Sequence, residues 1–337
     1  MSNVTIKDIA AAAGVSHPTV SKVLNNASGV SEETRERIKR IAKQMDYVPN
    51  YAARNLANKR NRSLGLIWPD VEGLFYYHLC DTLHKEAAKR RIDVFVSMSG
   101  ATHALRNFNE HFIDYVVCWF SPMWMPEDDF IREKEHFKGQ ITIIGGGRTE
   151  GANLILIDRS EGIFSAMQYL STMGHKKIAF VGIDPEKIKG YMKGVLHNGL
   201  HFTPEYMITA PNDFYYGTEG KNGLAERFTA LWRGRDRPTA LILDSQGSAF
   251  AMINVLSSLG IRIPDELSIV SYDDIPEFSV YPVRLDTVSP SIHELIKLVL
   301  DDYEVFCQHG ERRGETLKII VPELIVRESV RKLDVKE

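Results

Sequence analysis

A set of polar residues near the N-terminus lies outside the apolar stripe of a predicted short helix. These residues are His17, Thr19, Ser21, Lys22 and Asn25. The stripe itself consists of Val20, Val23 and Leu24, which are three and four residues apart and so share one helix face. Hydroxyl, amide, imidazole and ammonium groups on the exposed face can form hydrogen bonds with base edges, and lysine can donate to O6 and N7 of guanine. The chemistry that these residues suggest is recognition of DNA.

Two capping signals define the elements that position this face. Thr5 followed by Asp8 is a capping box, which predicts a helix that begins at the next residue after Thr5. An alanine run carries that helix to Gly14, which suits the left-handed position after a helix end. Ser16 then supplies an N-cap hydroxyl, and Pro18 falls in the first turn, where its missing N–H costs nothing. Two short helices joined by a glycine-containing turn predict a helix-turn-helix.

Charge supports this interpretation over an ordinary three-helix piece of a larger core. Residues 1–62 hold 11 Lys and Arg against 5 Asp and Glu, a net charge of +6. The whole chain has a net charge of −3, so residues 63–337 carry −9. A basic segment on an acidic body is expected of a domain that contacts phosphates and a body that does not.

Several motifs of the chain occur in a fixed order. The N-terminal ones are TIKDIA, AGVS, TVSKVLN, YVPN and A-x-x-L-A, and the later ones are MGHKKIAFVG (173–182), LSIVSYDDIPE (267–277) and VPELIVRES (321–329). With them the chain resembles the LacI/GalR family of bacterial transcription regulators over nearly its whole length. The resemblance implies a small all-α helix-turn-helix DNA-binding domain with a hinge helix. It also implies an α/β periplasmic-binding-protein-like body of two doubly wound parallel-sheet subdomains.

A third helix and a short hinge complete the predicted DNA-binding region. Ser31 caps the third helix, which spans roughly 32–45. Residues 51–58 can form only about two helical turns, which is marginal in water, so a plain linker is the alternative. The resemblance implies that this hinge folds on operator DNA and wedges Leu56 into the minor groove. The DNA contacts that we infer are Thr5, Ser16, His17, Pro18, Thr19, Ser21, Lys22, Asn25, Asn50, Ala53 and Leu56.

From residue 63 onward, short apolar runs alternate with amphipathic stretches. The runs SLGLIW, DVFVSM, YVVCWF, ITIIGG, KIAFVG, TALILD and LSIVSYDD predict buried parallel strands in two successive βαβ series. Ligands are expected beyond the carboxyl ends of such strands. The predicted boundaries are 1–48 for the DNA-binding domain and 49–62 for the hinge. The first subdomain takes 63–158 and 285–318, and the second takes 159–284 and 319–331.

The resemblance also implies a set of effector-binding residues in a cleft between the subdomains. They are Phe75, Trp119, Lys187, Phe214, Ser245, Asp273 and Asp274. Each aromatic could equally be a core residue. Lys187 stands where the family usually has arginine, which puts bidentate capture of a carboxylate or sugar diol in doubt. Ser245-Gln246 replaces a common Asn-Asp pair, and Gly145 lies where one sugar-binding member has an aspartate. The sequence therefore does not name the effector.

Other classes of protein are disfavoured by what the sequence contains. It holds no run of 18 apolar residues and no apolar signal core, so we expect a cytoplasmic protein. Cys80, Cys118 and Cys307 form neither a disulfide framework nor a zinc motif. His175 with the Asp273-Asp274 pair lacks an accompanying nucleophile elbow, P-loop or metal-ligand spacing, and His175 is expected to be structural. The segment GGGR (145–148) lacks the spacing of a nucleotide-binding loop and is expected to line the cleft.

Together with the resemblance, these features predict a homodimeric repressor, and the resemblance alone implies that its target genes serve carbohydrate or sugar-acid utilisation. It would bind a pseudo-palindromic operator in double-stranded DNA, and a sugar or sugar derivative would regulate it without any cofactor or metal. A cytoplasmic sugar-binding module and an enzyme on the same α/β fold are the alternatives. Loss of specific DNA binding would indicate the former, and turnover of candidate sugars the latter.

The hinge gives a prediction from sequence alone. Leu56→Ala should weaken specific operator binding strongly and shrink the effector's influence on it, because the segment has too little length to stay helical without its apolar contacts. Non-specific DNA binding should barely change. Titrations of the variant on operator and random DNA, with and without effector, measure both quantities. If both stay intact, the segment is only a tether.

Overall fold

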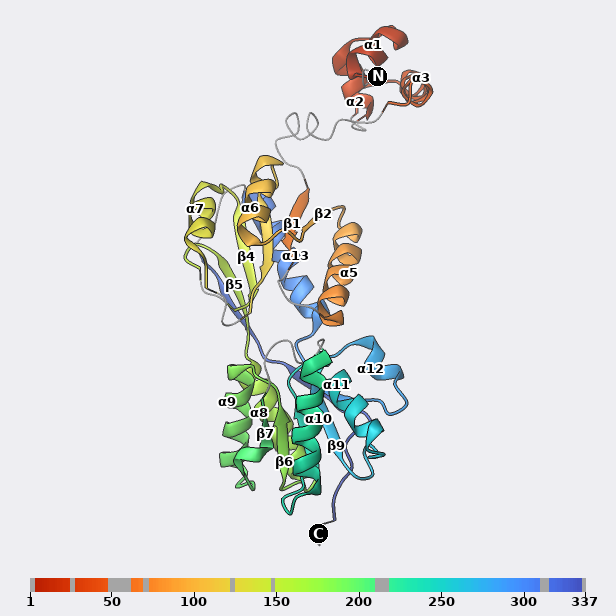
Figure 1. The fold of residues 1–337 in the computed structure, drawn as a ribbon. Coiled ribbons are helices and arrows are strands. Elements are labelled where there is room, and N and C mark those ends of the chain that lie inside the picture. Colours follow the sequence, from red (N-terminus) through yellow and green to blue (C-terminus); the bar gives the residue numbers. More distant parts are fainter. Residues whose placement is uncertain are drawn as a thin grey trace. The chain divides into compact units, whose positions relative to one another are not determined.

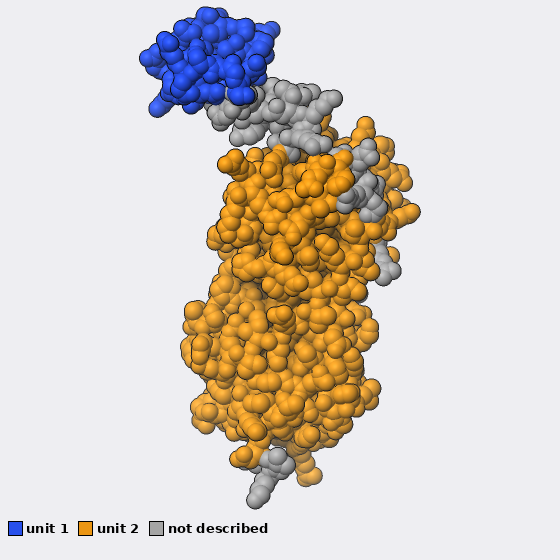
Figure 2. All heavy atoms as spheres, turned by 180° about the vertical axis from the view of Figure 1, so that it is seen from behind, with its two compact units in different colours: residues 1–61 blue, residues 62–337 orange. Residues whose placement is uncertain are grey.

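The chain forms two compact units, residues 1–61 and residues 62–337 (Figure 2). The structure is a computed structural model, and it describes residues 4–24, 28–47, 62–68, 73–121, 125–146, 149–209, 218–309 and 315–334. The predicted hinge and some of the predicted contacts lie outside the described residues. These contacts are Asn25, Asn50, Ala53, Leu56 and Phe214.

The first unit contains the predicted helix-turn-helix. Its helices are α1 (Ile6–Ala13), α2 (His17–Leu24) and α3 (Glu32–Gln44). The predicted capping box is confirmed, because the Thr5 N–H donates to Asp8 Oδ2 at 2.8 Å and the Asp8 N–H donates to Thr5 Oγ1 at 3.4 Å. Gly14 ends α1 with a left-handed φ of 63°. Ser31 caps α3 by accepting the Thr34 N–H.

Apolar residues from all three helices form the core of this unit. They are Ile9, Ala10, Ala13, Val20, Val23, Ile38 and Ala42. Val20 and Val23 belong to the stripe predicted for α2, and their burial turns the opposite side of α2 outward. Each short helix thus buries its apolar face against the other two helices. This packing is needed because isolated helices of this length are only marginally stable in water.

The first sheet of the second unit runs β11-β5-β4-β3-β1-β2, and all its neighbouring strands are parallel (Figure 1). Its strands are β1 (Ser63–Ile67), β2 (Asp93–Ser97), β3 (Tyr115–Trp119), β4 (Gln140–Gly145), β5 (Asn153–Ile157) and β11 (Leu317–Ile320). Its helices are α5 (Leu74–Lys89), α6 (Ala101–Glu110), α7 (Asp128–His136) and α13 (Ile292–His309). We call this sheet with its helices the first subdomain.

The second sheet runs β12-β10-β9-β8-β6-β7, and only β12, of the strands described, is antiparallel to its neighbour. Its strands are β6 (Ile178–Val181), β7 (Met207–Ile208), β8 (Ala240–Leu243), β9 (Ser268–Tyr272), β10 (Asp286–Ser289) and β12 (Glu323–Ile325). Its helices are α8 (Arg159–Thr172), α9 (Pro185–His197), η1 (Pro204–Tyr206), α10 (Thr218–Arg233), α11 (Gln246–Ser258) and α12 (Pro276–Val280). These elements form the second subdomain.

Helices cover both faces of each sheet, which confirms the predicted doubly wound architecture. In the first subdomain α5 and α13 bury one face, and α6 and α7 bury the other. In the second, α8 and α9 cover one face, and α10 and α11 cover the other. One cluster of buried apolar residues continues from the α5 side of the first sheet to the α11 side of the second. The two subdomains are therefore joined by apolar packing as well as by the chain.

The structure corrects the sequence-based prediction in three places, which are the burial of β2 and two of the crossings between the subdomains. β2 was expected to be buried, yet it lies at the sheet edge and leaves Phe95 and Val96 exposed. The sequence of an apolar run does not show whether the strand has a neighbouring strand on one side or on both sides. The chain was expected to return to the first subdomain near Leu285, but β10 still belongs to the second sheet, so the crossing follows Ser289. The last crossing follows Ile320 instead of residue 318.

His175 is buried where the C-terminal segment meets β6 and β8. Its Nε2 donates to the Arg331 carbonyl oxygen at 3.1 Å, and its Nδ1 lies 2.9 Å from Thr239 Oγ1. A carbonyl oxygen only accepts, so Nε2 carries the proton of the neutral ring. Burial lowers the pKa of His175 to about 4. These contacts support the structural role that was expected for this residue.

The lowered pKa of His175 makes stability depend on pH in a defined window. Between pH about 6.5 and about 4 the unfolded chain binds a proton at this ring and the folded chain does not. The free energy of unfolding should therefore fall as pH decreases through that window, by up to about 3 kcal/mol from this group. Urea unfolding of the wild type and of His175→Gln at several pH values measures the difference. Equal slopes for the two proteins would contradict this assignment.

Candidate functional site

The predicted DNA-contacting residues that the structure describes lie on and beside α2. His17, Pro18 and Lys22 are exposed, while Thr19 and Ser21 are half-buried. The side chains of two other predicted contacts form local hydrogen bonds. The Thr5 hydroxyl caps α1, and the Ser16 and Thr19 hydroxyls lie 2.9 Å apart. The geometry presents a small polar surface on one helix, which has the dimensions to enter a major groove.

A second group of candidate residues lies at the carboxyl ends of the parallel strands in both subdomains. The strand order of each sheet reverses beside its first strand, and the loops at such a switch point leave room for a ligand. Trp119 ends β3, Asp244 follows β8, and Asp273 follows β9. We call this group the interdomain cluster. Its members are Phe75, Tyr76, Trp119, Arg159, Asp184, Lys187, Asp244, Gln246, Tyr272 and Asp273.

Three aromatic rings form the part of the cluster that belongs to the first subdomain. Phe75 and Tyr76 come from the first turn of α5, and Trp119 ends β3. The ring centroids of Phe75 and Tyr76 lie 5.7 Å and 5.3 Å from that of Trp119, in edge-to-face arrangements. Phe75 and Trp119 are almost fully buried. They pack against each other as core residues do and also form an aromatic wall.

Buried charges form the part of the cluster that belongs to the second subdomain. Arg159 and Lys187 are each 7% exposed. Arg159 Nη1 donates to the Gly145 carbonyl oxygen at 2.8 Å, and Arg159 Nε lies 3.7 Å from Asp184 Oδ2. Lys187 Nζ lies 3.9 Å from the same carboxylate oxygen and 3.7 Å from the ring centre of Tyr272. Both cations are therefore held by chain atoms in fixed positions.

Backbone geometry at two positions allows these charges to approach. Gly145 has a φ of 97°, and a Cβ there would lie 2.7 Å from the Phe120 carbonyl oxygen and 3.3 Å from Arg159 Nη2. Asp273 has a φ of 68°, a conformation that non-glycine residues rarely adopt and that often occurs at functional sites. The predicted place of Gly145 beside the cluster is thus explained by its close contact with Arg159.

The ionisation of Asp273 and Tyr76 reflects the proximity of the two walls. Burial raises the pKa of Asp273, and the Lys187 cation and the backbone N–H of Gln246 oppose that rise. Burial, together with the negative charge of Asp273, raises the pKa of Tyr76 well above its ordinary value. Tyr76 belongs to the aromatic wall. Asp273 belongs to the charged residues that the second subdomain contributes to the cluster, which we call the charged wall. A ligand between them would meet ring faces on one side and charged hydrogen-bonding groups on the other.

Two of the predicted effector-binding side chains are held by the fold instead. Asp274 forms a two-pronged ion pair with Arg327, at 2.7 Å and 3.0 Å, and accepts the Thr287 hydroxyl at 2.9 Å. Ser245 caps α11 by accepting the Ser248 N–H at 3.2 Å. Their carboxylate and hydroxyl groups are already bonded to other parts of the second subdomain.

Sequence reasoning missed several members of the cluster. They are Tyr76, Arg159, Asp184, Asp244, Gln246 and Tyr272. Asp184 and Asp244 each follow a predicted strand, and Asp244 Oδ2 accepts the Ile183 N–H at 2.8 Å. A systematic search for polar residues just after each strand would have found these two. Arg159 follows β5, a strand that was not predicted, so its position carried no signal.

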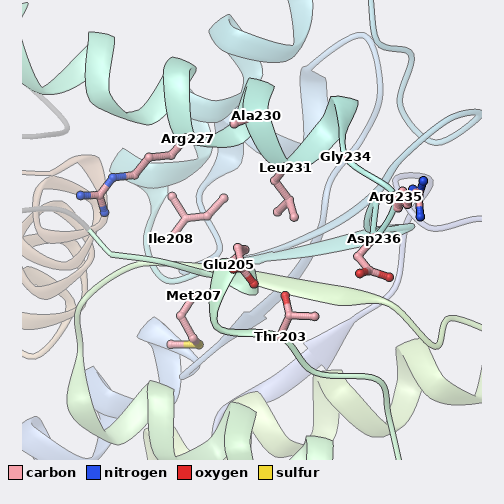
Figure 3. A pocket seen from close by; sticks show the side chains of 10 residues that line it. All are labelled: Thr203, Glu205, Met207, Ile208, Arg227, Ala230, Leu231, Gly234, Arg235 and Asp236. Carbon is pink, nitrogen blue, oxygen red and sulfur yellow. The ribbon is translucent and has the colours of Figure 1, made fainter.

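A separate hollow of about 540 Å³ lies in the second subdomain between η1, β7 and α10 (Figure 3). Ile208 and Leu231 point toward each other across it, while Arg227 and Asp236 lie toward opposite ends. All its lining residues fall within residues 203–236, and they include none of the described residues that the sequence predicted. This hollow is therefore distinct from the interdomain cluster.

In the part of the chain that the structure describes, no group of three or more His, Cys, Asp and Glu side chains is arranged to hold a metal ion. Within the same residues, no helix combines the length and the apolar character that crossing a bilayer requires.

Comparison with known proteins gives matches at both ends of the chain. Residues 5–50 match bacterial regulatory proteins of the lacI family, and residues 167–330 match the periplasmic binding protein-like domain. The chain is 27% identical over 315 residues to catabolite control protein A of Priestia megaterium, which covers 89% of each chain.

Solved structures show the same fold over the same extent. The lac repressor dimer bound to operator and the anti-inducer ONPF superposes with a TM-score of 0.77 at 21% identity, covering 98% of this chain and 100% of that one. The complex of the transcriptional regulator CelR with cellobiose gives a TM-score of 0.61 at 22% identity, covering 97% and 100%. These likenesses confirm the predicted fold class.

Proposed function

Because the chain belongs to the LacI family of bacterial regulatory proteins, we propose that it is a homodimeric transcription regulator that binds operator DNA. In this proposal it represses genes of carbohydrate or sugar-acid utilisation, and a small-molecule effector changes its affinity for the operator. The observation that carries the proposal is the exposed polar face of α2 on a separate, basic helical unit. The lac repressor structure, which contains an operator, is a relative of the same fold.

The charge and packing of the first unit support DNA binding. The positive charge of residues 1–62 favours contact with phosphates, while the opposite charge of the body favours solvent. Val20 and Val23 anchor α2 in the core, so His17 and Lys22 are presented from a packed helix. Base-reading side chains need such a rigid support, because discrimination depends on hydrogen-bond geometry.

The interdomain cluster supports a polyhydroxylated effector. Aromatic faces such as those of Phe75 and Tyr76 suit the apolar face of a sugar ring. Asp273 can accept hydrogen bonds from hydroxyl groups, and Arg159 and Lys187 can donate to hydroxyl or carboxylate oxygens. One relative of this fold is named as a complex with cellobiose. We therefore propose that Phe75, Trp119, Lys187 and Asp273 belong to an effector site, and we add Tyr76 and Arg159 to it.

Regulation, rather than turnover, is the activity we assign to this site. Three relatives with matching sequence are named as transcriptional repressors or regulators. His175, which could be drawn into a catalytic set with Asp273 and Asp274, is buried with both ring nitrogens bonded. The coupling between effector and operator is reciprocal by linkage, whatever the segment that transmits it. The predicted hinge lies outside the described residues and keeps its role as a proposal.

Base reading by Lys22 can be tested directly. Lys22→Ala should weaken binding to the cognate operator by ~1–3 kcal/mol and relax the preference at one base pair, because the lysine donates to a guanine edge. Lys39→Ala on α3 is the matched control, since Lys39 lies 3.1 Å from Glu36 and should not change base preference. Binding to operator variants at several salt concentrations measures both effects. If Lys22→Ala weakens all DNA sequences equally, the residue contacts phosphate.

The two neighbouring aspartates should behave differently. A thermal-shift panel of sugars and sugar acids identifies the effector, because a ligand at 100 times its Kd stabilises the folded state by about 2.7 kcal/mol. Asp273→Asn should then lower effector affinity by about tenfold or more while the protein still folds. Asp274→Asn should cost about 1–3 kcal/mol of stability, because it disrupts the contact with Arg327.

Calorimetric titration with the effector and urea unfolding of both variants separate these roles. A full effector response in Asp273→Asn, combined with a lost response in a stably folded Asp274→Asn, would reverse the two assignments.

A further inference from the structure

Helix α5 begins at a glycine, which has no side chain to cap it. Gly73 occupies the N-cap, so the first N–H groups of α5 need partners from elsewhere. The Phe75 N–H donates to Gln246 Oε1 at 3.1 Å. Gln246 is the first residue of α11, in the second subdomain, and is 3% exposed. A helix of one subdomain is thus capped by a side chain of the other.

The glycine is required for this contact. Gly73 has a φ of 147°, and a Cβ at that position would collide with the Gln246 amide nitrogen. Any other residue there would carry both backbone strain and a clash. Gly73 and Gln246 are therefore matched across the subdomain boundary.

A second bridge lies one turn further along α5. His78 Nε2 lies 3.1 Å and 3.2 Å from the two carboxylate oxygens of Glu277, in the first turn of α12. The first bridge uses the backbone N–H of Phe75 at the start of the helix, and the second uses a side chain three residues later. The first two turns of α5 are held to α11 and α12 by side chains of the second subdomain.

Gln246 also lies beside the charged wall. It stands two residues after Asp244, whose carbonyl oxygen accepts a hydrogen bond from Lys187 Nζ at 2.5 Å. The backbone N–H of Gln246 opposes the rise in the pKa of Asp273, while its side chain reaches the backbone of Phe75. It therefore connects a residue that presents a carboxylate to the turn that presents Phe75 and Tyr76. We propose that Gln246 is the positioning residue of the effector site. It fixes the aromatic wall against the charged wall through atoms of the chain itself, before any effector binds.

This arrangement has a consequence for affinity. A site whose walls are already fixed loses less conformational freedom on binding, so part of the affinity comes from preorganisation. Loss of the Gln246 side-chain acceptor should release the start of α5 and let the subdomains separate more often. The proposal depends on the proposed function only in naming the cluster an effector site, and its test uses the free protein without DNA or effector.

The test compares the wild type with two variants of similar side-chain length. Gln246→Met has similar length and lacks the oxygen acceptor, whereas Gln246→Glu keeps an acceptor at a helix N-terminus. Hydrogen exchange of the peptide that covers Phe75 should become about fivefold to tenfold faster in the Met variant, as expected for loss of one helix cap. The Glu variant should stay near wild type.

The subdomain separation is measured in the same proteins. Fluorophores on Glu110 and Leu196, both exposed and one in each subdomain, report the distance between the subdomains. The Met variant should show a longer or broader distance distribution, and the Glu variant should not. Faster exchange with an unchanged distance distribution would mean a local cap, and it would overturn the positioning role.

A double-mutant cycle tests whether Gly73 and Gln246 touch in solution. Gly73→Ala should destabilise the wild type more than it destabilises Gln246→Ala, because part of its cost is the collision with the amide, which the shorter side chain removes. The remaining cost is the strain at φ 147°. Additive effects of the two substitutions would show that the contact is not formed and would overturn the proposal. Because neither measurement involves DNA, this failure would leave operator binding by the wild type intact.

Discussion

The burial of two cations between the subdomains is the constraint on which the interdomain cluster depends. Arg159 and Lys187 are each 7% exposed, and removing an ion from water costs several kcal/mol. At an effective dielectric constant of about 20, two unit charges about 4 Å apart attract by roughly 4 kcal/mol, which is comparable with that cost. Asp184 lies close to both cations. Its attraction therefore offsets the free-energy cost of burying them, but it adds little net stability to the folded state. What the group secures is position, since moving any member would leave another charge buried and unpaired.

The same constraint explains the local backbone. Arg159 donates to the Gly145 carbonyl oxygen, and a Cβ at residue 145 would crowd the arginine at 3.3 Å and collide with the Phe120 carbonyl oxygen at 2.7 Å. Asp273 adopts a left-handed backbone conformation directly after β9. Strain of this kind persists where surrounding contacts determine it fully. One arrangement thus includes the buried charges, Gly145 and Asp273. The aromatic wall packs beside it from the first subdomain.

Local signals predicted more of this molecule than long-range ones did. The capping box of Thr5 and Asp8, the apolar stripe of α2 and most strands of the body depend on residues a few positions apart, and the structure confirms them. Asp273 was placed directly after a strand by a motif, and it lies directly after β9. The failures concern partners distant in sequence. Nothing near Asp274 indicates that Arg327 would bind its carboxylate, and nothing near Phe75 indicates that Gln246 would cap it. The edge position of β2 likewise depends on strand order.

An effector can influence the first unit only by interacting differently with two arrangements of the body. The interdomain cluster meets this requirement, because its walls come from different subdomains and its charges are balanced by one another. A ligand with hydroxyl or carboxylate groups would exchange hydrogen bonds with Arg159, Lys187 or Asp273, and so alter the balance that holds the walls together. The chain crosses between the subdomains after Ile157, Ser289 and Ile320, directly beyond strands that are packed in the sheets. Relative movement of the subdomains must therefore be absorbed in these short connections, and packed strands transmit it as rigid displacement. In the proposed function, the cluster is the place where small chemical differences between ligands become differences between arrangements of the whole body.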